Sequence, residues 1–221
     1  MKFFQNFNKY FLESKHSSLT NNYRSGEVIV SSGNNLMRNY GIPAKCFLID
    51  KKSARYKMYI DNVKFNIFNE FNQKYILKSD FYSAANKYLK LCHDIIAKNT
   101  YKTVLIMART KNIEFFISLS AFNDKLRKSF NNKTIYDKNV QVGTIHSFKG
   151  KEADIAIILD VTSKNFPLVH PDIGLYELFG RTLTVVLEEE KRLFYVAITR
   201  AKEAVYFLTE KNRESEYLKL I

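Results

Sequence analysis

The stretch Gly143-Thr144-Ile145-His146-Ser147-Phe148-Lys149-Gly150-Lys151-Glu152 overlaps the end of one apolar run, Val140–Thr144, and precedes another, Ile155–Val161. Runs that are close to continuous in apolar residues are typical of strands that helices cover on both faces. A hydroxyl, an imidazole and a lysine therefore follow a predicted buried strand, where the loops of an open α/β sheet carry their ligand groups. This stretch predicts a parallel α/β sheet with a binding loop at its edge.

The chain on either side of this stretch alternates predicted helices with predicted strands. Helical spacing of apolar residues, with an N-cap at Ser79 for the third helix, predicts helices over Phe3–Leu12, Glu27–Met37, Phe81–Ile96, Phe115–Phe130 and Leu187–Lys202. Short apolar runs predict strands over Cys46–Ile49, Tyr56–Ile60, Val63–Phe68, Thr103–Ala108, Val140–Thr144, Ile155–Val161 and Ala204–Leu208. This order predicts one α/β domain over residues 1–221 with a mostly parallel sheet, in which residues 45–77 form a small strand-rich excursion.

Composition narrows the class of protein. A chain of 221 residues with 46% hydrophobic content buries one core, or one core and a small appendage. Its longest apolar runs, such as Val104–Ala108, are far shorter than the roughly 20 residues of a membrane helix, so we expect a soluble protein with no membrane partner. Cys46 and Cys92 lie far apart without a C-x-x-C pair, so we expect neither zinc nor a disulfide framework, and a cytoplasmic location.

The formal net charge of +13 has two interpretations. Clustered lysine and arginine bind polyanions because they release counterions from phosphates, which favours a nucleic-acid partner. The alternative is an AT-rich genome, since lysine, asparagine, phenylalanine and tyrosine are abundant and the lysines are spread along the chain. The charge alone leaves both interpretations open.

Three segments carry motifs that identify a family. Leu19–Ser25 contains N-Y-R-S, Thr144–Glu152 reads T-x-H-x-x-K-G-x-E, and Glu189–Lys202 reads E-E-x-R-L-x-Y-V-A-x-T-R-A-K. In this order they resemble the later motifs of superfamily 1 DNA helicases of the UvrD and Rep type. Residues 19–202 cover most of the chain, so the resemblance is to a whole domain. That domain is the second RecA-like domain, which in the family faces the first across an ATP cleft.

The first motif supplies a flat ring and a planar cation side by side. Tyr23 offers a face on which a purine can stack, and Arg24 offers a fork that matches phosphate oxygens. The alternative from the residues alone is that Tyr23 covers the edge of a core and Arg24 caps a helix. The resemblance implies adenine stacking by Tyr23 and a contact from Arg24 to the terminal phosphate of ATP.

The second motif supplies donors for phosphate oxygens. Thr144, His146 and Lys149 can all donate to such oxygens. A lone histidine after a strand is more often structural, so the prediction for His146 depends on its motif. The resemblance implies that Thr144, His146 and Lys149 contact DNA and that Glu152 accepts from the ribose of ATP. Lys151 stands where the family generally has leucine.

The third motif ends with Arg200, close to the end of a predicted helix. The resemblance makes Arg200 an arginine finger, which stabilises charge on the transferred phosphoryl group and contributes about 10³ or more in rate. The alternative is a helix-terminal arginine that donates to carbonyl groups. Lys191 stands where the family commonly has arginine, which keeps the charge and loses the fork.

Two further residues, Asp160 and Arg109, stand in patterns that resemble known site motifs. Asp160 ends an apolar run in the manner of a magnesium-binding Walker B acid, but no glutamate follows, and we expect a strand-end residue. Arg109 lies in a segment that resembles the family's R-T-N strand near DNA. Lys111 replaces the asparagine of that motif, so Arg109 is a less specific candidate for DNA contact.

The chain lacks half of a complete ATP site. No G-x-x-x-x-G-K-[ST] phosphate loop occurs in the sequence. The resemblance implies that an N-terminal RecA-like domain, in cis or in trans, holds ATP and Mg²⁺. The interval between residues 111 and 140 is too short to hold the large helical insertion that UvrD has there. In this short interval the chain resembles the helicase IV branch of the family. We therefore expect either an excised piece or one part of a split gene.

The resemblance implies the C-terminal half of an ATP-dependent DNA helicase or translocase. It would supply the second wall of the ATP site and part of the track that holds single-stranded DNA. The DNA partner would be single-stranded or partly duplex, and the process would be one such as DNA repair. We expect no activity from the chain alone. Two alternatives are a non-catalytic nucleic-acid-binding module derived from a helicase, and the helicase part of a helicase-nuclease.

Overall fold

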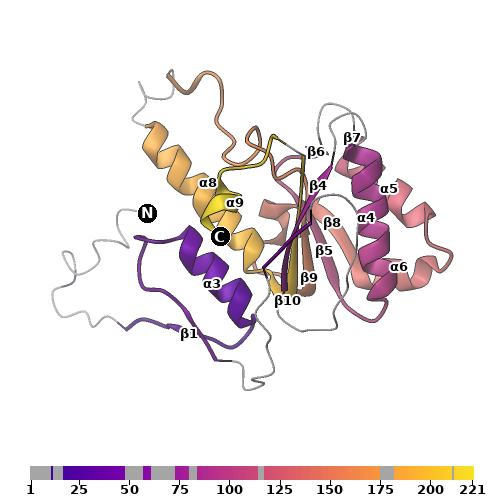
Figure 1. The fold of residues 1–221 in the computed structure, drawn as a ribbon, viewed down its shortest axis with the longest axis horizontal. Coiled ribbons are helices and arrows are strands. Elements are labelled where there is room, and N and C mark those ends of the chain that lie inside the picture. The colour runs from indigo at the N-terminus through magenta and orange to yellow at the C-terminus, as the bar shows by residue number, and fades with distance from the viewer. Residues whose placement is uncertain are drawn as a thin grey trace.

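The computed structural model describes residues 11, 17–47, 57–60, 73–79, 84–113, 117–174, 182–210 and 212–221. The fold is a six-stranded sheet with helices on both faces (Figure 1). One face carries α4 (Ala84–Lys98), α5 (Leu119–Lys128) and α6 (Lys133–Asn139). The opposite face carries α3 (Glu27–Leu36), α8 (Leu183–Ile198) and α9 (Tyr217–Leu220).

The strands of the large sheet lie in the order β3-β4-β10-β9-β5-β8, and every pairing between them is parallel. The strands are β3 (Lys57–Ile60), β4 (Gln73–Ser79), β5 (Val104–Ala108), β8 (Val140–Thr144), β9 (Ala153–Ile158) and β10 (Ala201–Glu210). Because the strands are parallel, all of their amino ends lie at one edge of the sheet and all of their carboxyl ends at the other. The predicted α/β fold class with a mostly parallel sheet is confirmed.

Two small pairs of strands and a short 3₁₀ helix complete the described fold. The strand β1 (Asn21–Asn22) pairs in parallel with β2 (Lys45–Cys46), and β6 (Asn112–Ile113) pairs antiparallel with β7 (Ile117–Ser118). A short 3₁₀ helix, η3 (Ile145–Phe148), follows β8.

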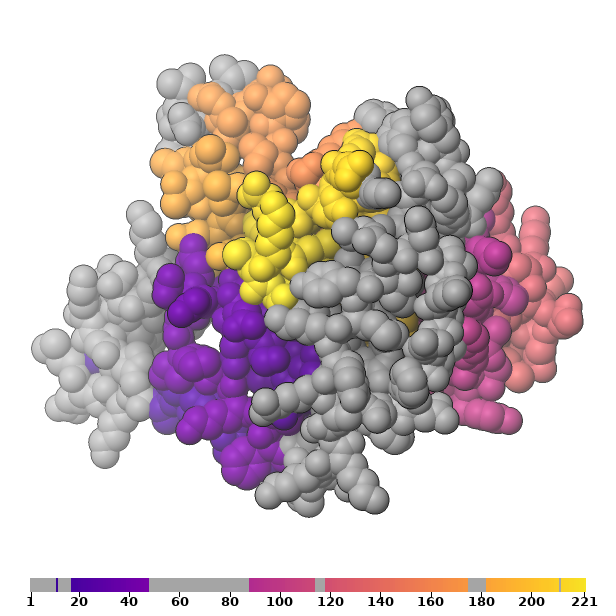
Figure 2. All heavy atoms as spheres, in the orientation of Figure 1, coloured from indigo at the N-terminus to yellow at the C-terminus, as the bar shows by residue number. Residues whose placement is uncertain are grey.

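The core consists of two apolar clusters, one on each face of the sheet. Alternate residues of β5 enter different clusters, Leu105 and Met107 on the α8 face and Ile106 on the α4 face. This period of two explains why both neighbours along the strand are apolar, as the sequence predicted for strands with two covered faces. On the α8 face, α9 packs against α3 although the two lie at opposite ends of the chain (Figure 2).

Several predicted boundaries are wrong. The helix predicted to reach Lys202 ends at Ile198, where the hydroxyl of Thr199 donates to the Tyr195 and Val196 carbonyl oxygens. Lys202 therefore belongs to β10. The same helix begins at Leu183, after Thr182 accepts a bond from the Val185 N–H.

Other differences concern elements that local patterns did not show. The strand β4 was not predicted, and its last residue is Ser79, which we expected as an N-cap. The single helix expected before β8 is two helices, α5 and α6, the second with Asn132 as its N-cap. The predicted helix Phe3–Leu12 and the predicted strand Val63–Phe68 lie outside the described residues, Phe11 excepted. The single-domain organisation, the excursion over 45–77 and the short interval over 111–140 stay predictions.

Within the described ranges, none of the helices has both the length and the apolar character that crossing a membrane requires.

Gly143 lies where η3 folds back over β8. A Cβ atom built on Gly143 would lie 2.7 Å from the Ser147 hydroxyl oxygen and 3.0 Å from the Phe148 ring. Phe148 is buried, so its ring has little room to move. Glycine is therefore needed here for close approach and not for its backbone angles.

We predict that Gly143→Ala lowers the free energy of unfolding by about 1 to 3 kcal/mol, because overpacking forces a buried ring to shift. Urea denaturation of the 221-residue chain measures the change. Gly174→Ala is the matched control, since a Cβ on Gly174 meets nothing within 4 Å. Equal stability of Gly143→Ala and the parent chain would contradict the packing argument.

Candidate functional site

The N-Y-R-S segment is fixed to the first residues of β10. The Asn22 Oδ1 accepts from the backbone N–H groups of Arg24 and Ser25, both at 2.9 Å, which shapes the turn. The Ser25 hydroxyl donates to the Ala201 carbonyl oxygen at 2.6 Å, and the Gly26 N–H donates to the Lys202 carbonyl oxygen at 3.1 Å. These bonds place Arg24 at the amino edge of the sheet.

A carboxylate between two cations lies at this amino edge. Glu152 directly precedes β9, and its Oε2 lies 2.6 Å from the Arg24 Nε. Its Oε1 lies 2.7 Å from the Lys202 Nζ. The ammonium of Lys202, and then the guanidinium of Arg24, hold the pKa of Glu152 below its ordinary value. The carboxylate is therefore ionised at neutral pH and orients both cations.

Arg200 brings a third cation to the same edge. Its Nε donates to the Val196 carbonyl oxygen at 3.1 Å and its Nη1 donates to the Lys151 carbonyl oxygen at 2.9 Å. Partial burial, and then the positive charge of Arg24, lower the pKa of Arg200. These two bonds use two of the five N–H donors that a guanidinium carries, so the fork can still meet a ligand.

The four side chains leave a net positive site. Three cations, Arg24, Arg200 and Lys202, surround the single carboxylate of Glu152, which leaves two positive charges in excess. Two arginine forks close enough to repel each other are a site for an anion, because a phosphate offsets the repulsion and matches the planar forks. The predicted residues Arg24, Glu152 and Arg200 are therefore brought together, as expected from the three motifs.

Tyr23 lies beside the charged cluster, and its ring packs against the ring of Phe47, which the sequence did not indicate. Its side chain is 65% exposed and its ring centroid lies 5.5 Å from that of Phe47, at an interplanar angle of 54°. The Phe47 N–H donates to the Asn22 carbonyl oxygen at 2.8 Å, which continues the β1–β2 pairing. The sequence predicted a strand over the apolar run that contains Phe47, and no local pattern indicates that its half-exposed ring packs beside Tyr23.

The residues expected to contact DNA begin at the opposite edge of the sheet from the charged cluster. Thr144 ends β8 and is in register with Ala108, at the carboxyl edge. Glu152 lies at the amino edge, so the motif crosses the length of the strands, about 13 Å for four residue steps. His146 and Lys149 are exposed on the crossing segment. The Thr144 Oγ1 accepts from the Ser147 N–H at 3.4 Å, which starts η3.

Arg109 directly follows β5, whose last residue Ala108 is the register partner of Thr144. Its Nε and Nη2 donate to the two oxygens of Glu190, at 2.8 and 2.6 Å, and both side chains are largely buried. The Leu168 N–H also donates to Glu190, at 3.1 Å. Because Glu190 uses the fork of Arg109, a DNA contact by Arg109 stays a prediction that this geometry does not favour. Glu190, which ties α8 to β5, was missed by the sequence analysis.

Asp160, whose position in the sequence resembles that of a magnesium-binding Walker B acid, lies beyond the end of β9. Its backbone takes a left-handed φ of 54° and its side chain is buried. The Asn165 amide donates to its carboxylate. Burial raises the pKa of Asp160 to about 6. No group of three or more histidine, cysteine, aspartate or glutamate side chains placed to hold a metal occurs in the described part of the chain.

We predict that Asp160→Asn makes the chain more stable at pH 8 by about 2 to 3 kcal/mol, because the buried charge is removed. Protonated Asp160 favours the folded state, so this stability is complete below the ordinary pKa of 3.8 and is lost as the pH rises through about 6. Asparagine also tolerates the left-handed backbone. Thermal unfolding of both proteins between pH 4 and 8 measures the difference, which should close toward pH 4. Asp172→Asn, at an exposed acid, is the control.

The family model and the curated relative that match this chain are both of helicases. A family model described as the UvrD-like helicase C-terminal domain matches residues 93–212. A curated relative, "Putative ATP-dependent DNA helicase YjcD" of Bacillus subtilis (strain 168), is 33% identical over 112 residues. That alignment covers 51% of this chain and 14% of the relative, so the chain matches only a small part of the longer protein.

Among solved structures, the chain is similar to the C-terminal domain of a possible DNA helicase from Lactobacillus plantarum WCFS1. The TM-score is 0.48 and the sequence identity is 14%, with 89% of this chain and 91% of the other covered.

Proposed function

Because the chain belongs to the UvrD-like helicase C-terminal domain family, we propose that it is the second RecA-like domain of an ATP-dependent DNA helicase. In this role it supplies one wall of the ATP site and part of the single-stranded DNA track. The observation that carries the proposal is the excess positive charge where Arg24, Arg200 and Lys202 surround Glu152 at the amino edge. A triphosphate is the ligand whose charge and oxygens best match that cluster.

Each side chain of the cluster has a separate role in this proposal. Arg200 acts as the arginine finger, and Arg24 contacts the terminal phosphate. Glu152 orients Arg24 and accepts from a ribose hydroxyl, since a carboxylate has about four acceptor positions and two are used. Adenine stacks on Tyr23, with Phe47 beside it. Mg²⁺ and the remaining phosphate contacts are assigned to an N-terminal RecA-like domain in cis or in trans.

The DNA track lies at the opposite edge in this proposal. Thr144, His146 and Lys149 donate to phosphates of the strand, and residues 144–152 join that edge directly to the nucleotide edge. Movement of the DNA strand at Thr144 therefore acts on Glu152 through the short segment between them. The conformation of this segment is fixed by η3 and by the turn at Gly150, whose φ is 88°. Coupling of ATP hydrolysis to translocation follows from this connection. A cytoplasmic location and a part in DNA repair stay predictions.

The two alternatives are not favoured by the family match. A non-catalytic binding module would have no need for Arg200 beside Arg24, because two neighbouring cations repel each other and the repulsion costs free energy without an anion. The helicase part of a helicase-nuclease would use the same site. That alternative differs from the proposal only in the presence of a nuclease domain beside this one.

We predict that the purified chain releases no phosphate from ATP above the blank, with or without single-stranded DNA, because one wall cannot align a nucleophilic water with a terminal phosphate. A phosphate-release assay measures this. Addition of a phosphate-loop domain from the same helicase should restore turnover. Turnover by the chain alone that Arg200→Ala abolishes would contradict the proposal.

We predict that Arg200→Ala in the two-domain enzyme lowers kcat by about 10³ or more and changes the KM for ATP much less, as expected for an interaction made in the transition state. Phe47→Ala should do the reverse, with a KM raised severalfold and kcat nearly unchanged, because base stacking is uniform binding. Steady-state ATPase kinetics separate the two. Lys128→Ala, at an exposed lysine on α5, is the control. Equal losses of kcat and affinity in Arg200→Ala would argue against a finger.

A further inference from the structure

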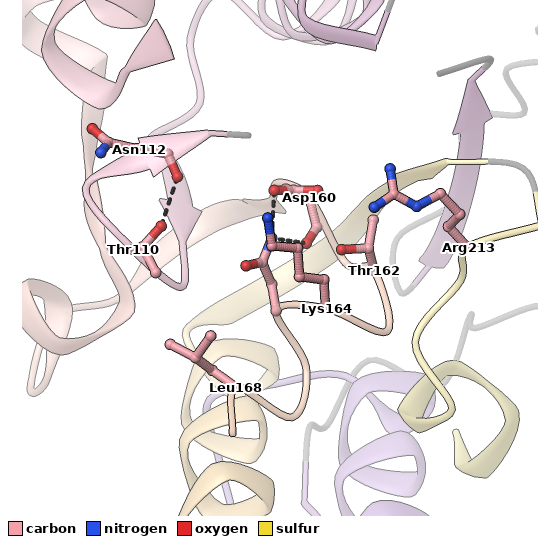
Figure 3. A pocket seen from close by; sticks show the side chains of 8 residues that line it. Thr110, Asn112, Asp160, Thr162, Lys164, Leu168 and Arg213 are labelled. Atoms are coloured by element: carbon pink, nitrogen blue, oxygen red, sulfur yellow. Dashed lines mark hydrogen bonds between the residues drawn. The ribbon is translucent and has the colours of Figure 1, made fainter. Parts of the chain in front are cut away.

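A second connection between the two edges of the sheet runs through α8. Glu190 lies in the middle of this helix, and its carboxylate accepts three bonds. Two come from the fork of Arg109, which directly follows β5, and the third comes from the Leu168 N–H, in the segment after β9. Figure 3 shows Leu168 beside α8, at one side of a pocket that Asp160 and Lys164 also line. Glu190 therefore ties α8 to the chain beyond two strands of the carboxyl edge.

The end of α8 carries Arg200 at the amino edge. The helix ends at Ile198, and the Arg200 Nε donates to the carbonyl oxygen of Val196, inside the helix, at 3.1 Å. From Glu190 to Ile198 the helix rises about 12 Å at 1.5 Å per residue. The helix thus spans the distance between the two edges, and the guanidinium of Arg200 moves with it.

The apolar contacts of α8 specify its position less sharply than this ion pair does. Phe194, Ala197 and Ile198 are buried in the core cluster on this face of the sheet. Attraction between apolar groups is non-directional. The bonds from Arg109 to Glu190, at 2.8 and 2.6 Å, are directional and weaken steeply when their partners are misaligned. The ion pair therefore fixes where α8 lies along the strands.

Stability is a weak reason for this ion pair. The side chains of Arg109 and Glu190 are only 17% and 8% exposed, so each charge loses hydration that their attraction must offset. Exchange of a buried pair for apolar residues of similar volume is often neutral or stabilising, whereas removal of one partner is strongly destabilising. The best-attested use of such pairs is to fix the register between packed elements.

We propose that Glu190 is a positioning residue that, through its pair with Arg109, sets where Arg200 stands when DNA is bound. Ala108, the residue before Arg109, is the register partner of Thr144 in the proposed DNA track. A DNA strand that displaces the end of β8 therefore moves Arg109 with β5, and the ion pair carries this displacement to α8. This connection is separate from the segment through η3, and the inference rests on the proposed function.

The test exchanges the ion pair for apolar residues in the two-domain enzyme. Arg109→Met together with Glu190→Leu should unfold at a Tm equal to or above that of the parent, because neither charge is left unpaired. With saturating oligo-dT, kcat should fall about ten- to a hundredfold, since a small misplacement of a catalytic group is costly. Without DNA, kcat should change much less. The Kd for oligo-dT and the KM for ATP should stay within about twofold, because the binding contacts are intact.

Two further variants complete the test. Arg127→Met together with Asp137→Leu makes the same exchange in a bidentate pair between α5 and α6, whose two bonds are both 2.6 Å long. This matched control should keep the stimulation by DNA of the parent. Arg109→Lys keeps the charge of the buried pair and loses the fork, so it should fold in any case and still lose stimulation by DNA.

The outcomes separate this inference from the proposed function. Stimulation equal to that of the parent in Arg109→Lys, or in a folded double variant, would overturn the inference and leave the proposed function intact. An equal fall of kcat with and without DNA would also overturn it, because a merely structural role gives that result. A raised Kd for oligo-dT with full stimulation at saturation would overturn it and make Arg109 a DNA contact. A parent enzyme whose ATP hydrolysis does not respond to DNA would overturn the proposed function as well.

Discussion

The bonds from Ser25 and Gly26 to the first residues of β10 hold the candidate site together. They join positions 176 residues apart in the chain. Ser25 is completely buried, and a buried hydroxyl without its partner would cost about 1 to 3 kcal/mol, so this contact has little freedom to rearrange. Because the turn at Asn22 fixes Arg24 relative to Ser25, the guanidinium reaches Glu152 as a consequence. The charged cluster is therefore a product of one tertiary attachment and not of local sequence.

The parallel sheet decides which groups can meet. Glu152, Arg200 and Lys202 all stand at or just before the amino ends of β9 and β10, so they share one edge. Thr144 and the pocket around Asp160 stand at carboxyl ends and share the other. Only elements that run the length of the strands connect the two edges. The segment 144–152 is one such element, and α8 is another, with Glu190 tied to Arg109 and Arg200 just beyond its end.

The sequence allowed the fold class to be predicted, and it also predicted that Arg24, Glu152 and Arg200 lie close together. The runs of β5 and β9 are apolar at consecutive positions, which only a strand with two covered faces explains. Arg24, Glu152 and Arg200 were found because their motifs are long. Phe47, Lys202 and Glu190 were not found, because their roles come from contacts with residues far away in the chain. The strand β4 was missed because its apolar residues stand between lysines and show no clear period.

The charged cluster at the amino edge differs in electrostatics from the pocket of about 310 Å³ that Asp160, Lys164 and Arg213 help to line at the carboxyl edge. At the amino edge a single carboxylate faces three cations, so Glu152 offsets only part of the repulsion between them and a bound anion would offset more of it. At the carboxyl edge Glu210 balances Arg213 and Asp160 balances Lys164, so an entering anion gains no net attraction while a neutral polar group pays no charge penalty. The electrostatics of the amino edge therefore favour an anion, whereas those of the pocket beside Asp160 do not.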